Sequence, residues 1–532
     1  MFSLIIAPLV YLAVHQTTSA SAFYVPVPVV APAGAPIISP SLISFSIEQD
    51  RWPEWVGTTT PNQYFYNLLD NLNILSGSYP WIRIGANSED HTKYDPSVEY
   101  NVDITPAVTP TVPYPEATNI TVGPAYYTLA ANLPPSTHVW WGVNLGQYNL
   151  SSAYYESMAM MSAFASPAIT SKGITLDFIE VGNEADLYSS NGARNSSWNP
   201  AEYVSEWTQF AGNVSAANNL YSLTNPKLIG GAFANSAYNA SGFSPEAIFD
   251  LGILDTAPGS LIRTISQHHY SGSFCAGSAS ALQDLMDKAT IRSNLSAFIG
   301  DIETVKGYGL DYVFGETNSY ACHGAPNVSN TAGAALWALD YSLYAGTIGA
   351  SRLFFHEGIG YKYNFIQPVT LNTSILDGTP LATPLPPHIQ PQYYSAVIAA
   401  EAIGRSGNTQ MVEISIPDQP YLAGYTFYVD GALERAILIN SESYISTEAG
   451  TPRTELSVSF NFTGPATAGR PSFMDIKRLN ITYADDTSGV TWGGQTYETP
   501  DGRVSGPVSL ETLTAGQAVS IQETEVVMVS FR

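Results

Sequence analysis

The sequence predicts an α/β protein in which a (β/α)8 TIM barrel is followed by a C-terminal all-β sandwich domain. Eight short apolar runs alternate with helix-like segments between residues 41 and 356, and eight β/α units make up such a barrel. From about residue 386 the chain changes to short β-rich runs separated by turns, a pattern typical of a β-sandwich. The length of 532 residues exceeds one ordinary domain, so two domains are expected.

The predicted barrel strands are apolar along most of their length, as strands buried on both faces are. They are expected at residues 42–47, 81–85, 138–146, 174–183, 227–233, 261–270, 310–317 and 351–358. Helices with apolar residues at three-to-four spacing are expected between them, among others at 62–72, 151–164, 200–214 and 331–346. This order gives domain limits of 41–385 for the barrel and 386–532 for the sandwich.

The N-terminal 40 residues contain two further segments. Residues 1–22 predict a secretory signal peptide, because an apolar run is followed by small residues ending in Ala20-Ser21-Ala22. That run is too short to span a membrane. Residues 23–40 are rich in proline and are expected to be extended and to join the β-sandwich. We therefore expect a secreted, extracellular protein that is not attached to a membrane.

The composition limits the range of partners. A formal charge of −25 argues against nucleic acid and against an anionic membrane surface, and it favours operation in acid. No nucleotide-binding, zinc-protease or serine-hydrolase pattern occurs, and no cofactor is expected. Ten Asn-x-Ser/Thr sites predict N-glycans on a monomeric chain. These sites are Asn119, Asn149, Asn195, Asn213, Asn239, Asn294, Asn327, Asn372, Asn461 and Asn480.

Two predicted strands end in a carboxyl group. The segment FIEVGNEADLY ends its apolar run in Asn183-Glu184, and LDYVFGETNSY ends its run in Gly315-Glu316. Either glutamate alone could be a polar residue at the rim of a sheet. Two carboxyls at the C-terminal ends of parallel barrel strands, however, lie where such barrels carry their catalytic groups.

Glycoside hydrolysis needs a pair of carboxyls of this kind. One protonates the departing glycosidic oxygen and must be neutral, while the other faces the oxocarbenium-like carbon and must be ionised. Different surroundings push the two pKa values apart. Asn183 is placed to hydrogen-bond the sugar hydroxyl beside the reacting carbon.

The segments WIRIGANSED, VGNEADLY, HHYSG and FGETNSYACHGAPNVSNT resemble glycoside hydrolase family 79, which contains fungal and bacterial β-glucuronidases and mammalian heparanase. The resemblance covers most of the chain, including the C-terminal β module. It implies a retaining mechanism with Glu184 as acid/base and Glu316 as nucleophile.

Several residues are further candidates for the site. We expect Tyr270 to hydrogen-bond the ionised Glu316, and we favour it over His268 and His269, because two histidines without a third ligand do not make a zinc site. No metal site is expected. Arg83 is expected to point into the barrel near the nucleophile.

The loop that follows Arg83 supplies polar candidates. Asn87 is a candidate ligand, the resemblance implies that Asp90 binds sugar hydroxyls, and Glu89 is expected to be a solvated acid. The strand at 138–146 offers Trp140 and Trp141 for stacking, although an inward tryptophan is more often barrel core, and Asn144 as a hydrogen-bond donor.

The resemblance also implies how a uronic carboxylate would be bound, namely by backbone amides after the nucleophile and by a tyrosine. By position these are Cys322, His323 and Gly324, with Tyr361 as the tyrosine and Tyr363 as the competing choice. His323 could add a pH-dependent positive charge.

Cys275 and Cys322 could form one disulfide or remain two thiols, because sequence gives no distance between them.

The residues and the resemblance together predict a secreted, exo-acting retaining β-glucuronidase. It would remove terminal glucuronic acid, or 4-O-methylglucuronic acid, from a glycan substrate with β-linked glucuronic acid. A heparanase-like endo-enzyme is less well supported, since the 20 basic residues show no cluster to grip a sulfated chain. An enzyme for neutral β-glycosides is a rival candidate, and a non-catalytic carbohydrate-binding protein is a candidate from a different class.

Overall fold

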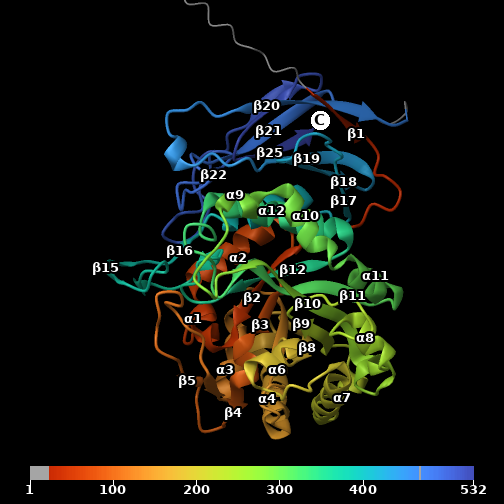
Figure 1. The fold of residues 1–532 in the computed structure, drawn as a ribbon, viewed down its shortest axis with the longest axis vertical. Coiled ribbons are helices and arrows are strands. Elements are labelled where there is room, and N and C mark those ends of the chain that lie inside the picture. The colour runs from red at the N-terminus through yellow and green to blue at the C-terminus, as the bar shows by residue number, and fades with distance from the viewer. Residues whose placement is uncertain (1–22, 466–468) are drawn as a thin grey trace, which may run out of the picture.

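The computed structural model describes residues 23–465 and 469–532. The predicted signal peptide at 1–22 lies outside the described residues. Figure 1 shows two stacked parts, a barrel with its helices and a C-terminal β domain. Helices α9 (Leu282–Met286), α10 (Lys288–Ser296) and α12 (Ala332–Ile348) lie near the junction of the two parts.

The barrel is closed, and its eight strands are all parallel to their neighbours. Each of the eight predicted runs forms one of these strands. They are β2 (Ile43–Glu48), β3 (Ile82–Gly85), β7 (His138–Val143), β8 (Thr175–Val181), β9 (Lys227–Phe233), β10 (Ile262–Ser273), β11 (Asp311–Ala321) and β12 (Arg352–Glu357). Parallel neighbours bring all the C-terminal strand ends, including those near Glu184 and Glu316, to one mouth.

Helices surround this barrel because their apolar faces cover the outer surface of the strands. They are α1 (Trp52–Val56), α2 (Gln63–Ser76), α3 (Pro124–Thr128), α4 (Leu150–Phe164), α5 (Pro167–Thr170), α6 (Tyr188–Asn191), α7 (Pro200–Ala217), α8 (Pro245–Asp250) and α11 (Ile299–Gly307), besides α9, α10 and α12.

The helix that follows the eighth strand corrects the predicted domain limit. It is α13 (Tyr393–Ile403), which packs on α2 and α12. A (β/α)8 barrel needs a helix after its last strand to cover that part of the sheet. The barrel therefore continues to residue 403, and the limit at 385 is too early.

Short β elements extend from the mouth of the barrel. The loop after β3 carries a three-stranded sheet of β4 (Thr92–Tyr94), β6 (Asn119–Val122) and β5 (Asn101–Ile104). After β12 come two small antiparallel pairs. They are β13 (Ile366–Gln367) with β16 (His388–Ile389), and β14 (Leu371–Thr373) with β15 (Pro380–Leu385).

The C-terminal domain contains two sheets that enclose an apolar core of their own. One sheet is antiparallel and contains β17 (Thr409–Glu413), β18 (Leu422–Val429), β19 (Ala432–Asn440), β25 (Glu525–Phe531), β21 (Phe473–Asn480), β22 (Thr491–Trp492) and β23 (Glu511–Thr514). The other contains β1 (Phe23–Pro28), β20 (Glu455–Thr463) and β24 (Val519–Gln522). Strand β1 runs parallel to β20, so the N-terminal segment is an edge strand of this domain (Figure 1).

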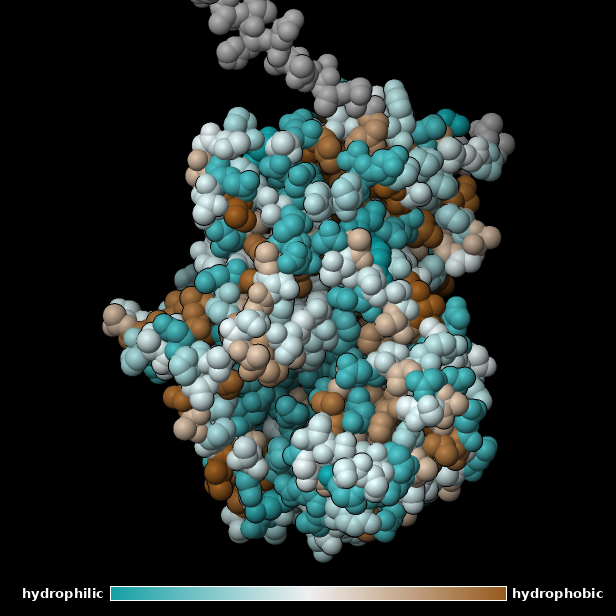
Figure 2. All heavy atoms as spheres, in the orientation of Figure 1, coloured by the Kyte–Doolittle hydropathy of each residue, from teal (hydrophilic) through white to brown (hydrophobic). Residues whose placement is uncertain are grey.

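The surface is mixed in character. Figure 2 shows hydrophobic residues scattered over a largely hydrophilic face. None of the helices in residues 23–465 and 469–532 has the length and apolar character that crossing a bilayer requires.

Candidate active site

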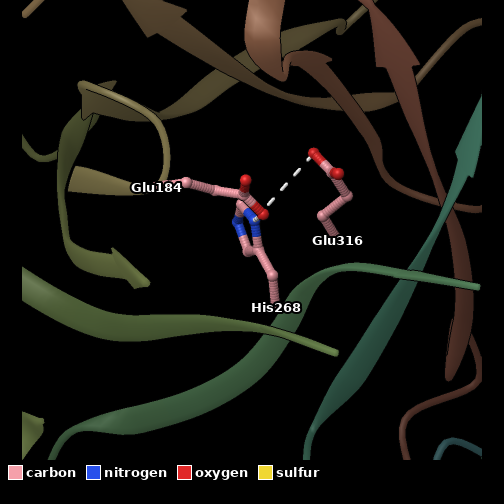
Figure 3. A group of neighbouring side chains, drawn as sticks. All are labelled: Glu184, His268 and Glu316. Atoms are coloured by element: carbon pink, nitrogen blue, oxygen red, sulfur yellow. Dashed lines mark hydrogen bonds and ion pairs between the residues drawn. The ribbon is translucent and has the colours of Figure 1, made fainter. Parts of the chain in front are cut away.

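Glu184 and Glu316 lie close together at the mouth of the barrel. One carboxyl oxygen of each lies within 4.8 Å of the other, and the two side chains point toward one another with His268 beside them (Figure 3). Glu184 follows β8 in the left-handed backbone region (φ 49°), and its N–H donates to Ala232 O (2.8 Å). The end of β9 therefore holds the backbone of Glu184 in a conformation that costs free energy for a residue with a side chain.

Hydrogen-bond donors surround the carboxylate of Glu316. Arg83 Nη1 donates to its Oε2 (2.8 Å), and the Tyr270 hydroxyl donates to its Oε1 (2.8 Å). His268 Nδ1 and His356 Nδ1 each lie 4.0 Å from Oε2. The predicted contacts of Arg83 and Tyr270 are both present, and each stabilises the ionised form of Glu316.

The two glutamates have opposite pKa shifts. Burial, and then the charge of Glu316, raises the pKa of Glu184 to about 8. Burial alone would also raise the pKa of Glu316, but positive neighbours, His356 foremost, and the Tyr270 hydrogen bond lower it below its ordinary value. At mildly acidic to neutral pH, Glu184 therefore carries a proton while Glu316 is ionised.

The two histidines differ in charge. Burial lowers the pKa of His268 to about 4, so its ring is neutral above that pH. Its Nδ1 lies 3.0 Å from Glu184 Oε1, at hydrogen-bond distance. Burial would likewise lower the pKa of His356, but Glu316 and the Glu48 hydrogen bond (3.0 Å) raise it to about 9. His356 therefore supplies a positive charge near Glu316.

The side chain of Asp90 lines a cleft at the barrel mouth, and its carboxylate oxygens accept hydrogen bonds from neighbouring protein groups. Its Oδ1 accepts from the N–H groups of Leu145 (2.9 Å) and Gly146 (2.7 Å). Its Oδ2 accepts from Asn183 N (3.2 Å) and the Tyr188 hydroxyl (2.6 Å). A carboxylate has about four acceptor positions, so protein donors occupy all of them and Asp90 organises the loops after β7 and β8.

Glu89 is fully buried, so the solvated position expected for this loop acid is wrong. The peptide turns directly after β3 into a 3-10 helix at Asn87–His91. This turn directs the side chain toward Arg83, whose Nη2 lies 3.8 Å from Glu89 Oε2. Asn87, in contrast, is exposed at the mouth.

The aromatic residues of β7 belong to the core. Trp140 lies inside the barrel with Ile229, Val313 and Phe354, and Trp141 packs against Trp52 outside it. Asn144 donates to Thr92 O (2.7 Å) and accepts from Gln147 N (3.0 Å), so it holds a loop. The two tryptophans are therefore not free to stack on a sugar, which agrees with the core position that the sequence favoured, and the amide of Asn144 is engaged within the protein.

The two cysteines form a disulfide, Cys275–Cys322, that joins the ends of β10 and β11. The loop after β11 has three successive residues with positive φ, at Cys322 (63°), His323 (67°) and Gly324 (84°). The Gly324 N–H donates to Tyr320 O (3.0 Å) and is not available to a ligand, contrary to expectation. Within the described residues, no acceptor is bonded to the N–H groups of Cys322 and His323.

Tyr361 packs against this loop. Its ring stacks on His323 at 3.8 Å between centroids, and its buried hydroxyl has no hydrogen-bond partner among the described residues. His323 Nε2 lies 2.7 Å from Glu116 Oε1. Burial would raise the pKa of Glu116, but the neighbouring His323 lowers it below its ordinary value, so the Glu116 carboxylate faces the His323 ring at the edge of the site.

A cleft of about 490 Å³ opens next to Asn183, the residue that precedes Glu184, although neither Glu184 nor Glu316 is among its lining residues. Asn87, Glu116, Gln147 and Asn183 are among its polar lining residues. Asn183 Oδ1 accepts from Arg83 Nη2 (2.8 Å). Its Nδ2 has no acceptor in the described part of the chain and remains available to a ligand.

Glu184, His268 and Glu316 could in principle hold a metal ion, because one ligand atom of each lies within 4.8 Å of the others. The sequence showed no third metal ligand beside His268 and His269, whereas the fold brings Glu184 and Glu316 next to His268. Both oxygens of Glu316, however, already accept hydrogen bonds from Arg83 and Tyr270. A cation bound there would have to compete with the guanidinium, so the donor set fits a metal poorly.

Three residues near the site were missed or ranked too low from sequence. His268 was placed below Tyr270, yet it contacts Glu184. His356 lies near the C-terminal end of β12. Barrel enzymes carry their site residues at such strand ends, so this position was a signal for His356. Glu180 accepts a hydrogen bond from Arg83 (2.6 Å), and its signal in the sequence was an acidic residue near the end of a largely apolar strand.

An eight-stranded parallel barrel with two facing carboxyls at its strand ends is the arrangement of glycoside hydrolases. Comparison with known proteins agrees. The C-terminal β domain of glycosyl hydrolase family 79 matches residues 424–528. A β-glucuronidase of Neurospora crassa is 30% identical over 516 residues, which are 89% of this chain and 87% of the relative. One of Aspergillus niger is 29% identical over 551 residues, 99% and 96% of the two chains.

The chain therefore belongs to glycoside hydrolase family 79. Among solved structures, a 4-O-α-L-rhamnosyl-β-D-glucuronidase from Fusarium oxysporum has the same fold, with a TM-score of 0.78 and 23% identity over 96% of this chain and all of that one. A family 51 α-L-arabinofuranosidase from Bifidobacterium longum is more distant, with a TM-score of 0.57 and 13% identity, over 96% of this chain and 99% of that one.

Proposed function

We propose that this protein is a secreted, exo-acting retaining β-glucuronidase that removes terminal glucuronic acid from glycans. The observation that carries the mechanism is the facing pair of a protonated Glu184 and an ionised Glu316, with oxygens within 4.8 Å. Retaining enzymes hold their carboxyls about 5 to 5.5 Å apart, whereas inverting enzymes need about 6.5 to 9.5 Å. The short separation favours retention.

In the first step, Glu316 attacks the anomeric carbon while the Glu184 proton passes to the departing glycosidic oxygen. This forms a glycosyl ester on Glu316 and leaves Glu184 ionised. In the second step, Glu184 takes a proton from a water molecule, the water oxygen displaces Glu316, and the sugar leaves with its original configuration. Asn183 Nδ2 is placed to donate to the hydroxyl beside the reacting carbon.

Two observations support the proposed glucuronate specificity. They are the similarity to two fungal β-glucuronidases and the donors in the loop after β11. A sugar carboxylate needs hydrogen-bond donors, and this loop offers the unused N–H groups of Cys322 and His323. The buried Tyr361 hydroxyl beside it also lacks a partner among the described residues. An unpartnered buried hydroxyl costs free energy unless a ligand completes its hydrogen bonding, so we assign these three donors to the carboxylate.

Exo action is supported by the segment between β5 and β6. Thr111 O of this segment accepts from Lys362 Nζ (3.2 Å), the Tyr114 hydroxyl donates to Thr373 O (2.9 Å), and Glu116 pairs with His323. A segment that begins after β3 thus reaches loops that follow β11 and β12. It covers one side of the barrel mouth, which suits the removal of a terminal sugar rather than cleavage within a long chain.

Secretion and glycosylation are part of the same proposal. None of the ten Asn-x-Ser/Thr asparagines is buried, so each could carry a glycan without unfolding the chain. Expression in a eukaryotic host would test this. An N-terminus at residue 23 and glycopeptides in the medium would agree with secretion, and intracellular retention of an unmodified chain would contradict it.

The decisive experiment compares p-nitrophenyl β-glucuronide with the matching β-glucoside and β-xyloside at about pH 5, between the ordinary pKa values of carboxyls and histidine. A strong preference for the glucuronide is expected, and NMR of early product should show the β-anomer. Activity on neutral sugars alone would overturn the specificity. Inactivity on all three would favour a non-catalytic carbohydrate-binding protein. A 4-O-methylglucuronide tests the second candidate sugar.

A further inference from the structure

A second carboxyl pair lies beneath the two catalytic candidates, inside the barrel. Glu89 and Glu180 are both almost completely buried, at 0% and 1% exposure. Glu180 Oε1 accepts from Arg83 Nε (3.1 Å) and Nη2 (2.6 Å). Neither oxygen of Glu89, nor Glu180 Oε2, has a donor among the described residues. Arg83 Nη2 lies 2.6 Å from Glu180 Oε1 and 3.8 Å from Glu89 Oε2, so the two carboxyls face the same guanidinium nitrogen.

An ionised carboxylate has acceptors but no donor, so these two groups can bond only if one of them carries a proton. Charge balance leads to the same requirement. The buried Arg83 guanidinium faces Glu89, Glu180 and Glu316. Arg83 and the positive His356 beside Glu316 are two cations for three buried carboxyls, and buried charges without compensation are strongly destabilising.

The backbone makes room for the Glu89 carboxyl. A Cβ atom at Gly142 would lie 1.8 Å from Glu89 Oε2, and one at Gly85 would lie 2.5 Å from the same oxygen. Gly142 is opposite Glu180 in the β7–β8 register. Two strands therefore lack side chains at the place where this carboxyl enters the barrel.

We propose that Glu89 and Glu180 share one proton, with Glu89 as the donor, and that this pair positions Arg83. The inference rests on the proposed role of Glu316. With the Glu89 hydroxyl bonded to Glu180 Oε2, Glu180 Oε1 holds two guanidinium nitrogens. Arg83 then presents Nη1 to Glu316 and Nη2 to Asn183.

The surrounding charges fit this assignment. Arg83 favours ionisation of the pair, whereas Asp90 opposes ionisation of Glu89. His268 would also favour ionisation of Glu180, but its ring is neutral above about pH 4. Burial raises the pKa of Glu89 well above its ordinary value, and the Glu180 charge adds to this effect. Glu89 and Glu180 act through Arg83 and are positioning residues.

The test uses Glu89→Gln, Glu89→Met and a control, Glu156→Gln. Glutamine has the shape of the protonated acid and keeps a donor, while methionine fills a similar volume without one. We expect kcat of Glu89→Gln on the aryl glucuronide to stay within about threefold of wild type, and that of Glu89→Met to fall about tenfold or more with little change in KM. Glu156 is another buried carboxyl, on α4, with a pKa raised to about 8, and its variant should keep wild-type kcat.

Infrared spectroscopy gives a readout that does not depend on turnover. The C=O stretch of a protonated carboxylic acid should be present in the wild type at pH 6. One such component should be lost in Glu89→Gln and a different one in Glu156→Gln. An unchanged spectrum in Glu89→Gln, or damage to kcat equal to that of Glu89→Met, would overturn the proposal. Inactivity of the wild type on every glycoside would refute the proposed function, while the infrared comparison would still decide the protonation of Glu89.

Discussion

The two candidate catalytic glutamates differ through their neighbours rather than their own chemistry. Glu316 accepts hydrogen bonds from a guanidinium and a phenol, with a charged histidine nearby. Glu184 is partly buried beside a neutral histidine and the negative charge of Glu316. We therefore expect Glu184 to hold a proton and Glu316 to be ionised, and replacing each should affect catalysis differently.

Replacing Glu316 by Gln should abolish turnover, because the amide cannot form the glycosyl ester. We expect kcat to fall by about four orders of magnitude or more, while calorimetry still detects glucuronate binding. Appreciable residual turnover that survives repurification would place the nucleophile on another residue.

Replacing Glu184 by Ala should matter most for poor leaving groups, which need a proton from the acid. A loss of about 10²- to 10⁴-fold is expected on a disaccharide substrate, and a much smaller loss in the first step with a p-nitrophenyl leaving group. Azide, which needs no general base, should restore release of the sugar as the β-azide. Equal losses on both substrates would contradict the acid role. The exposed Glu202 of α7 provides the control variant, Glu202→Ala.

Tyr361→Phe removes one proposed carboxylate donor. We expect kcat/KM on the glucuronide to fall about tenfold relative to the glucoside, the value of one hydrogen bond to a charged group. Tyr203→Phe, which changes a buried hydroxyl on α7 that bonds Gly231 O at 3.4 Å, should leave this ratio unchanged. An unaltered ratio in Tyr361→Phe would remove Tyr361 from the carboxylate site.

At the scale of elements, the disulfide fixes the loop after β11 to the end of β10. This loop holds left-handed conformations at Cys322 and His323, which a free chain adopts rarely. The crosslink spans 47 residues and should stabilise the fold by about 3 to 4 kcal/mol in the chain-entropy description.

Replacing both cysteines by Ser should therefore lower Tm and loosen the proposed carboxylate donors. We expect KM for the glucuronide to rise about fivefold to tenfold, or about 1 to 1.4 kcal/mol, with little change in kcat. The ratio of glucuronide to glucoside KM separates this effect from general destabilisation. A fall in Tm without a change in that ratio would show that the disulfide only stabilises the fold.

At the scale of the whole molecule, the proposed mechanism needs Glu316 ionised and Glu184 protonated. The pKa of Glu316 is lowered and that of Glu184 is raised to about 8. The kcat/KM profile on a disaccharide should therefore be broad, extend to neutral pH, and fall as the pH rises through about 8. The falling limb should vanish in Glu184→Ala. A fall centred near pH 5 would contradict the assignment.

Stability should follow the same charges. The pKa of His356 rises on folding from 6.5 to about 9. A group whose folded pKa is raised adds stability that is fully present below its unfolded pKa and is lost as the pH rises through the folded value. Tm should therefore fall between about pH 6.5 and 9, and this slope should be smaller in His356→Gln. Equal slopes would show that His356 is not charged in the folded protein.

Much of this molecule could be predicted from the order of its residues. Apolar runs and helical spacing determine the eight barrel strands, because a strand buried on both faces must be apolar throughout. Asn183-Glu184 and Glu316 stand at the ends of such runs, so parallel packing alone brings them to one mouth. Arg83 and Tyr270 were found for the same reason, since each belongs to a strand of the barrel.

Only the tertiary structure decided what surrounds each group. Asp90 and Glu89 are adjacent in sequence but differ in their surroundings. The carboxylate oxygens of Asp90 accept hydrogen bonds from protein groups, whereas Glu89 is buried beneath the site. The disulfide, the use of the Gly324 N–H within its own loop, and the charge of His356 depend on distances between segments far apart in the chain. A pKa or an open hydrogen-bonding position is set by burial and neighbours, and neither can be read from local sequence.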